Sequence, residues 1–326
     1  MFKKLILITL GMALALSACS GSGSTNGSGG LTKIRLPMGY VPNIQFAPFY
    51  VAIQKGYFRD AGIEIEFDYS YETNGVKLVG AGELPFAIAS GDQVLDAREK
   101  GLPVTYVAAW YQQYPVSVVA KSDLGILIPQ DLKGKKIGLP GLFGASYVGL
   151  RALLFKAKMS ESNVTLDSIG FNQVDLMAAG KQDVVVVYTA NEPIQLRARG
   201  IPITEIRVSD YVQLASNGIL ASEKVIAENP KLVRAFVGAF LKGLADTIAN
   251  PDDAFKLSES FIPNFADLDA KVQKQILDTS IEEWKADRLG YSDPKAWENM
   301  QNVLLEAGLI NQKMDLSKAF TNEFVP

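Results

Sequence analysis

The sequence contains no histidine, and this absence excludes several function classes at once. Histidine is the commonest general base and the commonest metal-binding side chain of proteins. Without it, neither a serine–histidine–acid triad nor a cysteine–histidine pair can form. Chemistry that needs only carboxylates stays possible. Most hydrolase and metalloenzyme interpretations are therefore excluded.

Cysteine is also scarce, and the positive charges form no basic run. Cys19 is the single cysteine, so the chain can form neither an internal disulfide nor a cysteine-based zinc site. The formal net charge is −3 and the isoelectric point is near 5.3. No basic run stands out, although nucleic-acid binding depends on lysines and arginines that neutralise phosphates. The composition therefore argues against nucleic acid as a partner.

The N-terminus has the pattern of a bacterial lipoprotein signal. Lys3 and Lys4 precede an apolar stretch at 5–16, which is too short to span a bilayer because a span needs about 20 apolar residues. The stretch ends in Leu-Ser-Ala before Cys19, which resembles a lipobox. We therefore expect removal of a signal peptide at 1–18 and lipidation of Cys19. An ordinary secretory signal with an incidental cysteine is the alternative.

The segment that follows Cys19 is predicted to be a tether. Residues 20–30 (SGSGSTNGSGG) include no apolar side chain, and glycine and serine make such a segment flexible. We assign 19–30 to this tether. No later segment of the sequence is long and apolar enough to cross a membrane. We expect a body anchored by lipid on the extracytoplasmic face of the cell membrane.

From residue 31 onward, short apolar runs alternate with amphipathic segments. The predicted strands are 33–38, 63–67, 86–89, 104–110, 116–120, 136–139, 168–171, 184–188 and 203–208. The predicted helices are 46–55, 75–81, 91–100, 147–157, a long one after Asn229, 267–287 and 293–306. This alternation is typical of parallel sheets covered by helices on both faces. The pattern restarts near residue 136, so we predict two α/β lobes with a ligand cleft between them.

Several segments resemble one family of solute-binding proteins of bacterial ABC importers. They are GYVPN at 39–43, FAPFYVA at 46–52, KGYF at 55–58, LPFAIASG at 84–91 and DLKGKKIG at 131–138. That family serves importers of thiamine pyrimidine precursors, riboflavin, taurine, alkanesulfonates and nitrate. The resemblance implies a two-lobed periplasmic-binding-protein fold (type II), in which two crossing strands join the lobes. We assign 31–118 and 217–326 to lobe 1, and 119–216 to lobe 2.

Three predicted turns at strand ends supply candidate ligand-binding residues. Tyr40 and Asn43 follow the first strand, and Ser90 and Gly91 begin a helix, where backbone N–H groups can face a ligand. The turn at 141–147 (GLFGASY) would do the same in the second lobe. Its candidate residues are Phe143, Gly144, Ser146 and Tyr147. A phosphate-binding loop would need a following Gly-Lys-Ser/Thr, which is missing, so nucleotide hydrolysis is not predicted.

Aromatic and amide side chains cluster at the expected cleft. We expect Trp110, Tyr111, Tyr147 and Tyr188 to line it, while Tyr106 and Phe46 are assigned to the core. Stacked aromatic rings suit a flat heteroaromatic ligand, at about 0.5–1.5 kcal/mol per pair beyond buried area. The neighbouring polar candidates are Gln112, Asn191, Glu192 and Asn217. Amides pair with uracil-like edges and hydroxyls, and a carboxylate accepts from an amino or imide N–H.

The choice of ligand depends on the same residues. No arginine is conspicuous in the predicted loops, which disfavours sulfonate and nitrate because these anions need cationic donors. The strings WYQQYP at 110–115 and GLFGASY at 141–147 resemble the riboflavin-binding branch of the family. The branch that binds formylaminopyrimidine or hydroxymethylpyrimidine is the alternative, because Tyr188 and Glu192 would suit an aminopyrimidine equally well.

The resemblance implies capture of a small molecule and its delivery to a membrane permease with its ATPase. We expect a monomer that uses no cofactor and no metal. An enzyme related to this fold makes the thiamine pyrimidine from its own histidine with pyridoxal phosphate and iron. This chain has no histidine and lacks that family's cysteine-rich iron motif, so we predict that it is not an enzyme. A structural surface lipoprotein is the remaining class, and the aromatic cleft argues against it.

Overall fold

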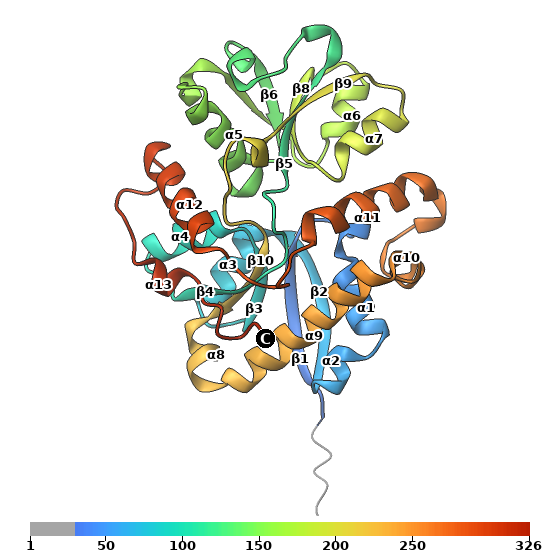
Figure 1. The fold of residues 1–326 in the computed structure, drawn as a ribbon, viewed down its shortest axis with the longest axis vertical. Helices are drawn as coiled ribbons and strands as arrows, with labels where there is room; N and C mark the ends of the chain where they lie inside the picture. Colours follow the sequence, from blue (N-terminus) through green and yellow to red (C-terminus); the bar gives the residue numbers. More distant parts are fainter. Residues whose placement is uncertain (1–29) are drawn as a thin grey trace, which may run out of the picture. The chain divides into compact units, whose positions relative to one another are not determined.

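The structure is a computed structural model that describes residues 30–326. The predicted signal peptide, Cys19 and nearly all of the tether lie outside the described residues. Residues 31–326 form one compact unit. It contains two groups of strands, each covered by helices (Figure 1).

The first group of strands comes from both ends of the chain. Strand β1 (Thr32–Gly39) pairs with β2 (Ile63–Tyr71) in parallel, and β1 lies beside β3. Strands β3 (Phe86–Ala89) and β4 (Val104–Ala109) flank β10 (Gly218–Ser222), which runs antiparallel to both. Every residue of β3, β4 and β10 is buried, as expected for strands covered on both faces.

The second group is a five-stranded sheet in the order β7-β6-β8-β5-β9. Its strands are β5 (Val116–Lys121), β6 (Lys136–Leu139), β7 (Thr165–Ser168), β8 (Val184–Tyr188) and β9 (Ile203–Arg207). Strand β6 runs parallel to β7 and β8, whereas β5 runs antiparallel to β8 and β9. Each group therefore includes one reversed strand, β10 or β5, close to where the chain passes between the groups.

The helices divide in the same way (Figure 1). Those with the second sheet are α5 (Gly144–Lys156), α6 (Gln173–Ala178) and α7 (Glu192–Ala198). Those with the first group are α1 (Ala47–Gln54), α2 (Tyr57–Asp60), α3 (Glu72–Gly80), α4 (Gly91–Glu99), α8 (Glu223–Glu228), α9 (Pro230–Ala249), α10 (Pro251–Ser258), α11 (Ala270–Trp284), α12 (Pro294–Glu306) and α13 (Leu316–Ala319).

Helix α9 shows how the sequence specifies an element of the core. The Asn229 side chain accepts a hydrogen bond from the Leu232 N–H, and Pro230 occupies the first turn, as predicted. Phe236 and Phe240 are fully buried, and Phe240 packs on Phe49 with ring centroids 4.6 Å apart. Helix α1 crosses α9 so closely that a Cβ atom at Gly243 would lie 2.2 Å from a backbone oxygen. Glycine is therefore required at this crossing.

Two segments connect the strand groups. Residues 110–115 lead from β4 to β5, and residues 208–217 lead from β9 back to β10. This arrangement agrees with two joined lobes, and we call the elements of the first group lobe 1 and those of the second sheet lobe 2. Strand β5 belongs entirely to the second sheet. The exact residues at which one lobe ends and the other begins remain a prediction.

Several sequence predictions differ from the structure. The predicted strand at 168–171 is wrong, because β7 ends at Ser168 and the chain turns before α6. Strand β10 is absent from the predictions, and β2 continues four residues beyond the predicted end to Tyr71. Helix α3 therefore begins at Glu72 rather than at Gly75. Because β2 ends later and α3 begins earlier than predicted, two side chains that the sequence did not single out, Tyr71 and Glu72, lie beside the cleft.

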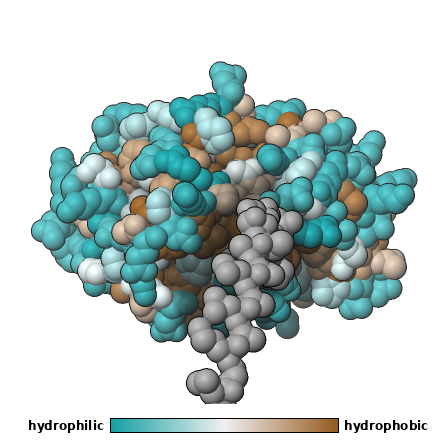
Figure 2. Space-filling model, turned by 90° about the horizontal axis from the view of Figure 1, so that it is seen from below, coloured by the Kyte–Doolittle hydropathy of each residue, from teal (hydrophilic) through white to brown (hydrophobic). Residues whose placement is uncertain are grey.

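The surface of the described part is mixed. Hydrophilic residues cover most of the face in Figure 2, with apolar residues toward its middle. Among residues 30–326, no helix has both the length and the apolar character needed to cross a membrane.

Candidate ligand-binding site

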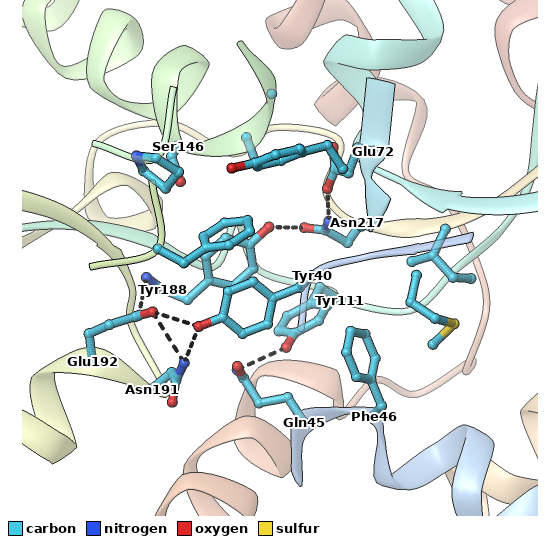
Figure 3. Close-up of a pocket in the computed structure, with 18 of the residues that line it drawn as sticks. Tyr40, Gln45, Phe46, Glu72, Tyr111, Ser146, Tyr188, Asn191, Glu192 and Asn217 are labelled. Atoms are coloured by element: carbon cyan, nitrogen blue, oxygen red, sulfur yellow. Dashed lines mark hydrogen bonds between the residues drawn. The ribbon is translucent and has the colours of Figure 1, made fainter. Parts of the chain in front are cut away.

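A pocket lies where the strand groups meet (Figure 3). Its empty volume is about 800 Å³, part of which is open to solvent. The lining residues are Met38, Gly39, Tyr40, Gln45, Phe46, Tyr71, Glu72, Ile88, Trp110, Tyr111, Pro140, Phe143, Gly144, Ala145, Ser146, Phe171, Gln173, Tyr188, Asn191, Glu192 and Asn217.

Strand ends supply most of the polar and aromatic wall. Tyr40 follows β1, Glu72 follows β2, and Tyr188 is the last residue of β8. Phe143 precedes α5, and Asn217 precedes β10. The expected position of the site, at strand ends between two lobes, is therefore where the pocket lies.

Aromatic rings from both lobes meet in the pocket. The Tyr40 ring of lobe 1 contacts the Phe171 ring of lobe 2 edge to face, with centroids 4.6 Å apart. The ring centroid of Tyr71, in lobe 1, lies 5.5 Å from that of Phe143 and 5.2 Å from that of Phe171. Tyr71 and Phe143 are each 38% exposed, so their rings have surface free for a further partner. A flat ligand would find aromatic faces on both sides of the junction.

Glu192 holds one side of the pocket together. Its Oε1 accepts from the Tyr40 hydroxyl at 3.3 Å and from Nδ2 of Asn191 at 3.2 Å. Its Oε2 accepts from the Tyr188 backbone N–H at 2.9 Å. Burial raises the pKa of this carboxyl, and these donors act in the opposite direction. Glu192 therefore positions two tyrosines and links the lobes through Tyr40.

A second hydrogen-bonded chain lies on the opposite side of the tyrosine rings (Figure 3). The Tyr188 hydroxyl donates to Oδ1 of Asn217 at 3.1 Å, and Nδ2 of Asn217 donates to Oε1 of Glu72 at 2.8 Å. The Ser90 hydroxyl donates to Oε2 of Glu72 at 2.9 Å. This chain connects lobe 2 to lobe 1 through side chains alone.

Glu72 has a strongly perturbed carboxyl group. Its side chain is half-buried and lines the pocket. Burial, followed by the nearby negative charge of Asp92, raises its pKa to about 7. Burial also raises the pKa of Asp92, which is 1% exposed. The left-handed conformation at Gly39 (φ +80°) requires glycine there, and a Cβ atom would lie 2.6 Å from Cγ of Glu72.

Two lining residues carry buried polar atoms with no partner in the described part of the chain. They are Oε1 of Gln173 and Nε1 of Trp110. The Gln173 amide donates through Nε2 to the Val186 carbonyl at 3.3 Å, which leaves Oε1 as a free acceptor. Unpaired buried groups are costly unless a ligand or water meets them. Both atoms are therefore candidate ligand contacts.

The pocket brings together ten of the residues that the sequence singled out. They are Tyr40, Trp110, Tyr111, Phe143, Gly144, Ser146, Tyr188, Asn191, Glu192 and Asn217. Trp110 is 2% exposed and lies in a cluster with Phe46 and Trp284, so it belongs to the core as well as to the wall.

Five other candidates lie outside the wall, for identifiable reasons. The Asn43 side chain caps a short helix by accepting from the Gln45 N–H. Ser90 is fully buried behind Glu72, and Gly91 lies directly against Ala215.

The remaining two of these candidates point elsewhere. Gln112 lies in the segment that leads from β4 to β5 and does not line the pocket. Its backbone N–H donates to the Glu283 carbonyl. The Tyr147 hydroxyl contacts Glu161 and accepts from Arg151 at 2.7 Å, and its ring lines a separate groove beside α4 and α5. The contacts of Tyr147 account for the position of its side chain without a ligand, whereas Nε2 of Gln112 is buried with no hydrogen-bond partner among residues 30–326.

Sequence reasoning missed several residues of the wall. Phe46 was assigned to the core, but it also lines the pocket. Gln45 donates from Nε2 to the Tyr111 hydroxyl at 3.2 Å. Tyr71, Glu72 and Phe171 were not predicted, because the ends of β2 and β7 were predicted at the wrong residues. The alternation of β2 through Tyr71 was the signal that could have found the first two.

The donor set offers no metal centre. Among residues 30–326, no group of three or more Cys, Asp or Glu side chains is arranged to hold a metal ion. The Glu72–Asp92 pair consists of two carboxyls with no third ligand among the described residues.

Comparisons with known proteins extend the description. The sequence model of the family described as "NMT1/THI5 like" matches residues 43–254. The chain is 42% identical to the riboflavin-binding protein RibY of Chloroflexus aurantiacus, over 99% of this chain and 98% of that protein. It is 25% identical to the formylaminopyrimidine-binding protein of Halalkalibacterium halodurans, over 98% and 99% of the two chains.

More distant similarities include an enzyme and a solved structure. A 4-amino-5-hydroxymethyl-2-methylpyrimidine phosphate synthase of Legionella pneumophila is 22% identical, over 90% of this chain and 93% of that one. The alkanesulfonate-binding protein SsuA of Xanthomonas axonopodis pv. citri superposes with a TM-score of 0.71 at 16% identity, over 90% and 99% of the two chains. This likeness confirms the two-lobed binding-protein fold. The family match and the 42% relative together show that the chain belongs to the NMT1/THI5-like family.

Proposed function

We propose that this chain is the solute-binding component of an ABC importer and that its ligand is riboflavin. The ligand is captured between the two lobes and delivered to a membrane permease, whose ATPase drives release. The 42% identity to a riboflavin-binding protein over nearly all of both chains supports this assignment. The proposal includes no enzymatic step.

The observation that carries the proposal is the aromatic slot across the lobe junction. Tyr40 and Tyr71 come from lobe 1, and Phe143, Phe171 and Tyr188 come from lobe 2. A flat tricyclic ring placed among them would contact both lobes at once. Contacts to both lobes stabilise the closed form, because a ligand shifts a two-state equilibrium only through its preference for one state.

Amide and hydroxyl groups complete the proposed fit. The pocket wall includes the side chains of Gln45, Gln173, Asn191 and Asn217. Amides can pair with the uracil-like edge of a flavin and with the hydroxyls of its ribityl chain. The free acceptor Oε1 of Gln173 suits an N–H or O–H donor on the ligand.

Flavin fluorescence offers a direct test. We would titrate riboflavin with the purified full-length chain in a nonionic detergent, since stacking on tyrosine or tryptophan quenches flavin emission. Saturable quenching at one-to-one stoichiometry is expected. No quenching at micromolar protein would remove riboflavin as the ligand.

A thiamine pyrimidine precursor is the second candidate. The relative of 25% identity that is named for formylaminopyrimidine supports it, as does the carboxylate of Glu192 beside two tyrosines. An aminopyrimidine is smaller than a flavin and would fill less of the pocket. Calorimetry with formylaminopyrimidine and riboflavin separates the two, because the true ligand should bind the more tightly.

We also propose that the protein is a lipoprotein on the extracytoplasmic face of the cell membrane. The lipobox-like segment before Cys19 and the glycine- and serine-rich stretch after it support this location. The tether would keep the body near the permease while leaving the two lobes free to close.

A further inference from the structure

The pocket has an unusual balance of charge. None of the residues that line it, all within the described part of the chain, is a lysine or an arginine. Two of them, Glu72 and Glu192, are acidic, and they lie on opposite sides of the tyrosine rings (Figure 3). A negatively charged group that enters this pocket would therefore approach a carboxyl on either side.

Both carboxyls are hydrogen-bonded by neutral protein donors. The oxygens of Glu192 accept three hydrogen bonds. Those of Glu72 also accept three, from the side chains of Asn217 and Ser90 and from the Ser90 N–H, and the acidic side chain of Asp92 acts on Glu72 as a further negative charge. No cation offsets the charge of Glu72 within the described residues that contact its carboxyl.

One feature of the wall would ordinarily attract an anion. Helix α5 begins at Gly144 with no side-chain cap, and free N–H groups at a helix start favour negative charge. Glu72 already lies against this end, because a Cβ atom at Gly144 would be 3.6 Å from its Oε2. The carboxylate of the protein itself therefore lies beside the helix start that would otherwise attract a ligand phosphate.

We propose that Glu72 is a specificity-determining residue that restricts this site to ligands without negative charge, so that riboflavin is bound and its 5′-phosphate ester is rejected. The inference rests on the riboflavin assignment above. The free acceptor on Gln173 acts in the same direction, since it matches a hydroxyl or N–H and not a phosphate oxygen. The importer would then take up only the uncharged vitamer.

The test compares three flavins on the full-length chain in nonionic detergent at about pH 8, where the phosphate is a dianion. Riboflavin, its 5′-phosphate and its 5′-acetate are each titrated by fluorescence quenching. We expect the phosphate ester to bind about a hundredfold more weakly than riboflavin. That estimate counts one unit charge on Glu72 and one on the phosphate, about 6 Å apart at an effective dielectric constant of about 20, and the second charge of the dianion makes a hundredfold the lower bound. The uncharged acetate ester controls for size and should bind within about tenfold of riboflavin.

Two variants assign the effect to Glu72. Glu72→Gln keeps the shape and removes the charge, and it should reduce the discrimination to about tenfold or less by tightening binding of the phosphate ester. Glu228→Gln, on an exposed position of α8, is the matched control and should leave the ratio unchanged. The ratio should also persist in about 1 M salt, which screens surface charge over about 3 Å but not a buried contact.

The outcomes separate the two proposals. If riboflavin and its phosphate bind equally well, the charge filter is overturned and the riboflavin assignment stands. If the acetate ester binds as weakly as the phosphate, size and not charge excludes the phosphate, and the proposal also falls. The comparison of the acetate and phosphate esters uses the wild-type chain, so it tests the charge filter even if Glu72→Gln does not fold. If no flavin binds, the riboflavin assignment itself is overturned, and the charge filter falls with it.

Discussion

Asn217 donates a 2.8 Å hydrogen bond from its side-chain amide to Oε1 of Glu72. The same amide accepts from the Tyr188 hydroxyl through its oxygen, so Asn217 uses both ends of one side chain to join the lobes. It is 5% exposed and lies at the end of the second crossing segment. The backbone carbonyl of Asn217 also accepts from the N–H groups of Trp110 and Tyr111 on the first crossing segment. This residue therefore connects both crossings to the pocket wall.

Replacing this residue should weaken both binding and folding. In Asn217→Ala, the Tyr188 hydroxyl and the Glu72 carboxyl each lose a partner, and each buried group left unsatisfied costs about 1–3 kcal/mol. We expect the free energy of unfolding to fall by about 2–6 kcal/mol, the sum over the two groups, and riboflavin affinity to fall about tenfold. Urea unfolding and flavin quenching measure the two effects. Asn250→Ala, at an exposed position before α10, is the control. Wild-type values for both quantities would show that this link does not hold the lobes.

Stability should decrease as the pH rises from about 5 to about 8. Burial raises the pKa of Glu72 to about 7 and that of Glu283 to about 8, and it also raises those of Asp92 and Glu192. Because each folded-state value lies above the unfolded value, the native chain keeps protons that the unfolded chain has already released. Each group therefore lowers the free energy of unfolding by up to about 1.4 kcal/mol per pH unit within its own interval.

This pH dependence is unusually easy to assign. The chain has no histidine, so that common source of titration between about pH 5 and 8 is missing. We expect the melting temperature to fall steadily across this range, and Glu72→Gln should make the slope shallower. Thermal denaturation at several pH values measures both. A melting temperature that rises with pH, or an unchanged slope in the variant, would contradict the assignment to buried carboxyls.

Much of the fold was accessible from the sequence because several of its strands, such as β3, β4 and β8, are short, apolar and buried. The run at 184–188 became β8 with its predicted bounds, and the Asn229–Pro230 signal placed the start of α9 correctly. Strand β10 was missed because Gly218–Ser222 has no long apolar run of its own. Its role as the reversed strand between β3 and β4 depends on partners more than 100 residues earlier.

The site was predictable only in part, for a related reason. Tyr40 and Tyr188 adjoin strand ends that the sequence located, or nearly located, and they reached the pocket; Asn217 reached it too, although β10, the strand that follows it, was missed. Glu72 and Phe171 were missed because the ends of β2 and β7 were misplaced by a few residues. Tyr147 had the right chemistry and the right turn, but its direction depends on Arg151 one helical turn later and on Glu161 beyond it. Local pattern does not reveal such contacts.

Tyr147 and Tyr188 therefore offer a matched pair of substitutions. Tyr188 lines the pocket and bonds Asn217, whereas the Tyr147 hydroxyl is held by Glu161 and Arg151 outside it. We expect Tyr188→Phe to weaken riboflavin binding about three- to tenfold, because one hydrogen bond is worth about 1 kcal/mol. Tyr147→Phe should leave the affinity within about twofold. Calorimetric titration of both variants with riboflavin measures the two affinities. A larger loss of affinity for Tyr147→Phe than for Tyr188→Phe would show that Tyr147 contacts the ligand.

The anchor prediction can be tested independently of any ligand. One acyl chain gives only marginal membrane binding, whereas two hold a protein stably. The diacylglyceryl group expected on Cys19 carries two chains, so this modification would by itself account for attachment. We expect the wild-type chain, expressed in a bacterium, to incorporate labelled palmitate and to begin at Cys19 in its mature form. Cys19→Ala should incorporate none, while Ser20→Ala should be labelled like the wild type. Intact-mass measurement of the membrane fraction identifies the processed N-terminus. A mature chain that begins elsewhere and carries a free thiol would favour an ordinary secretory signal instead.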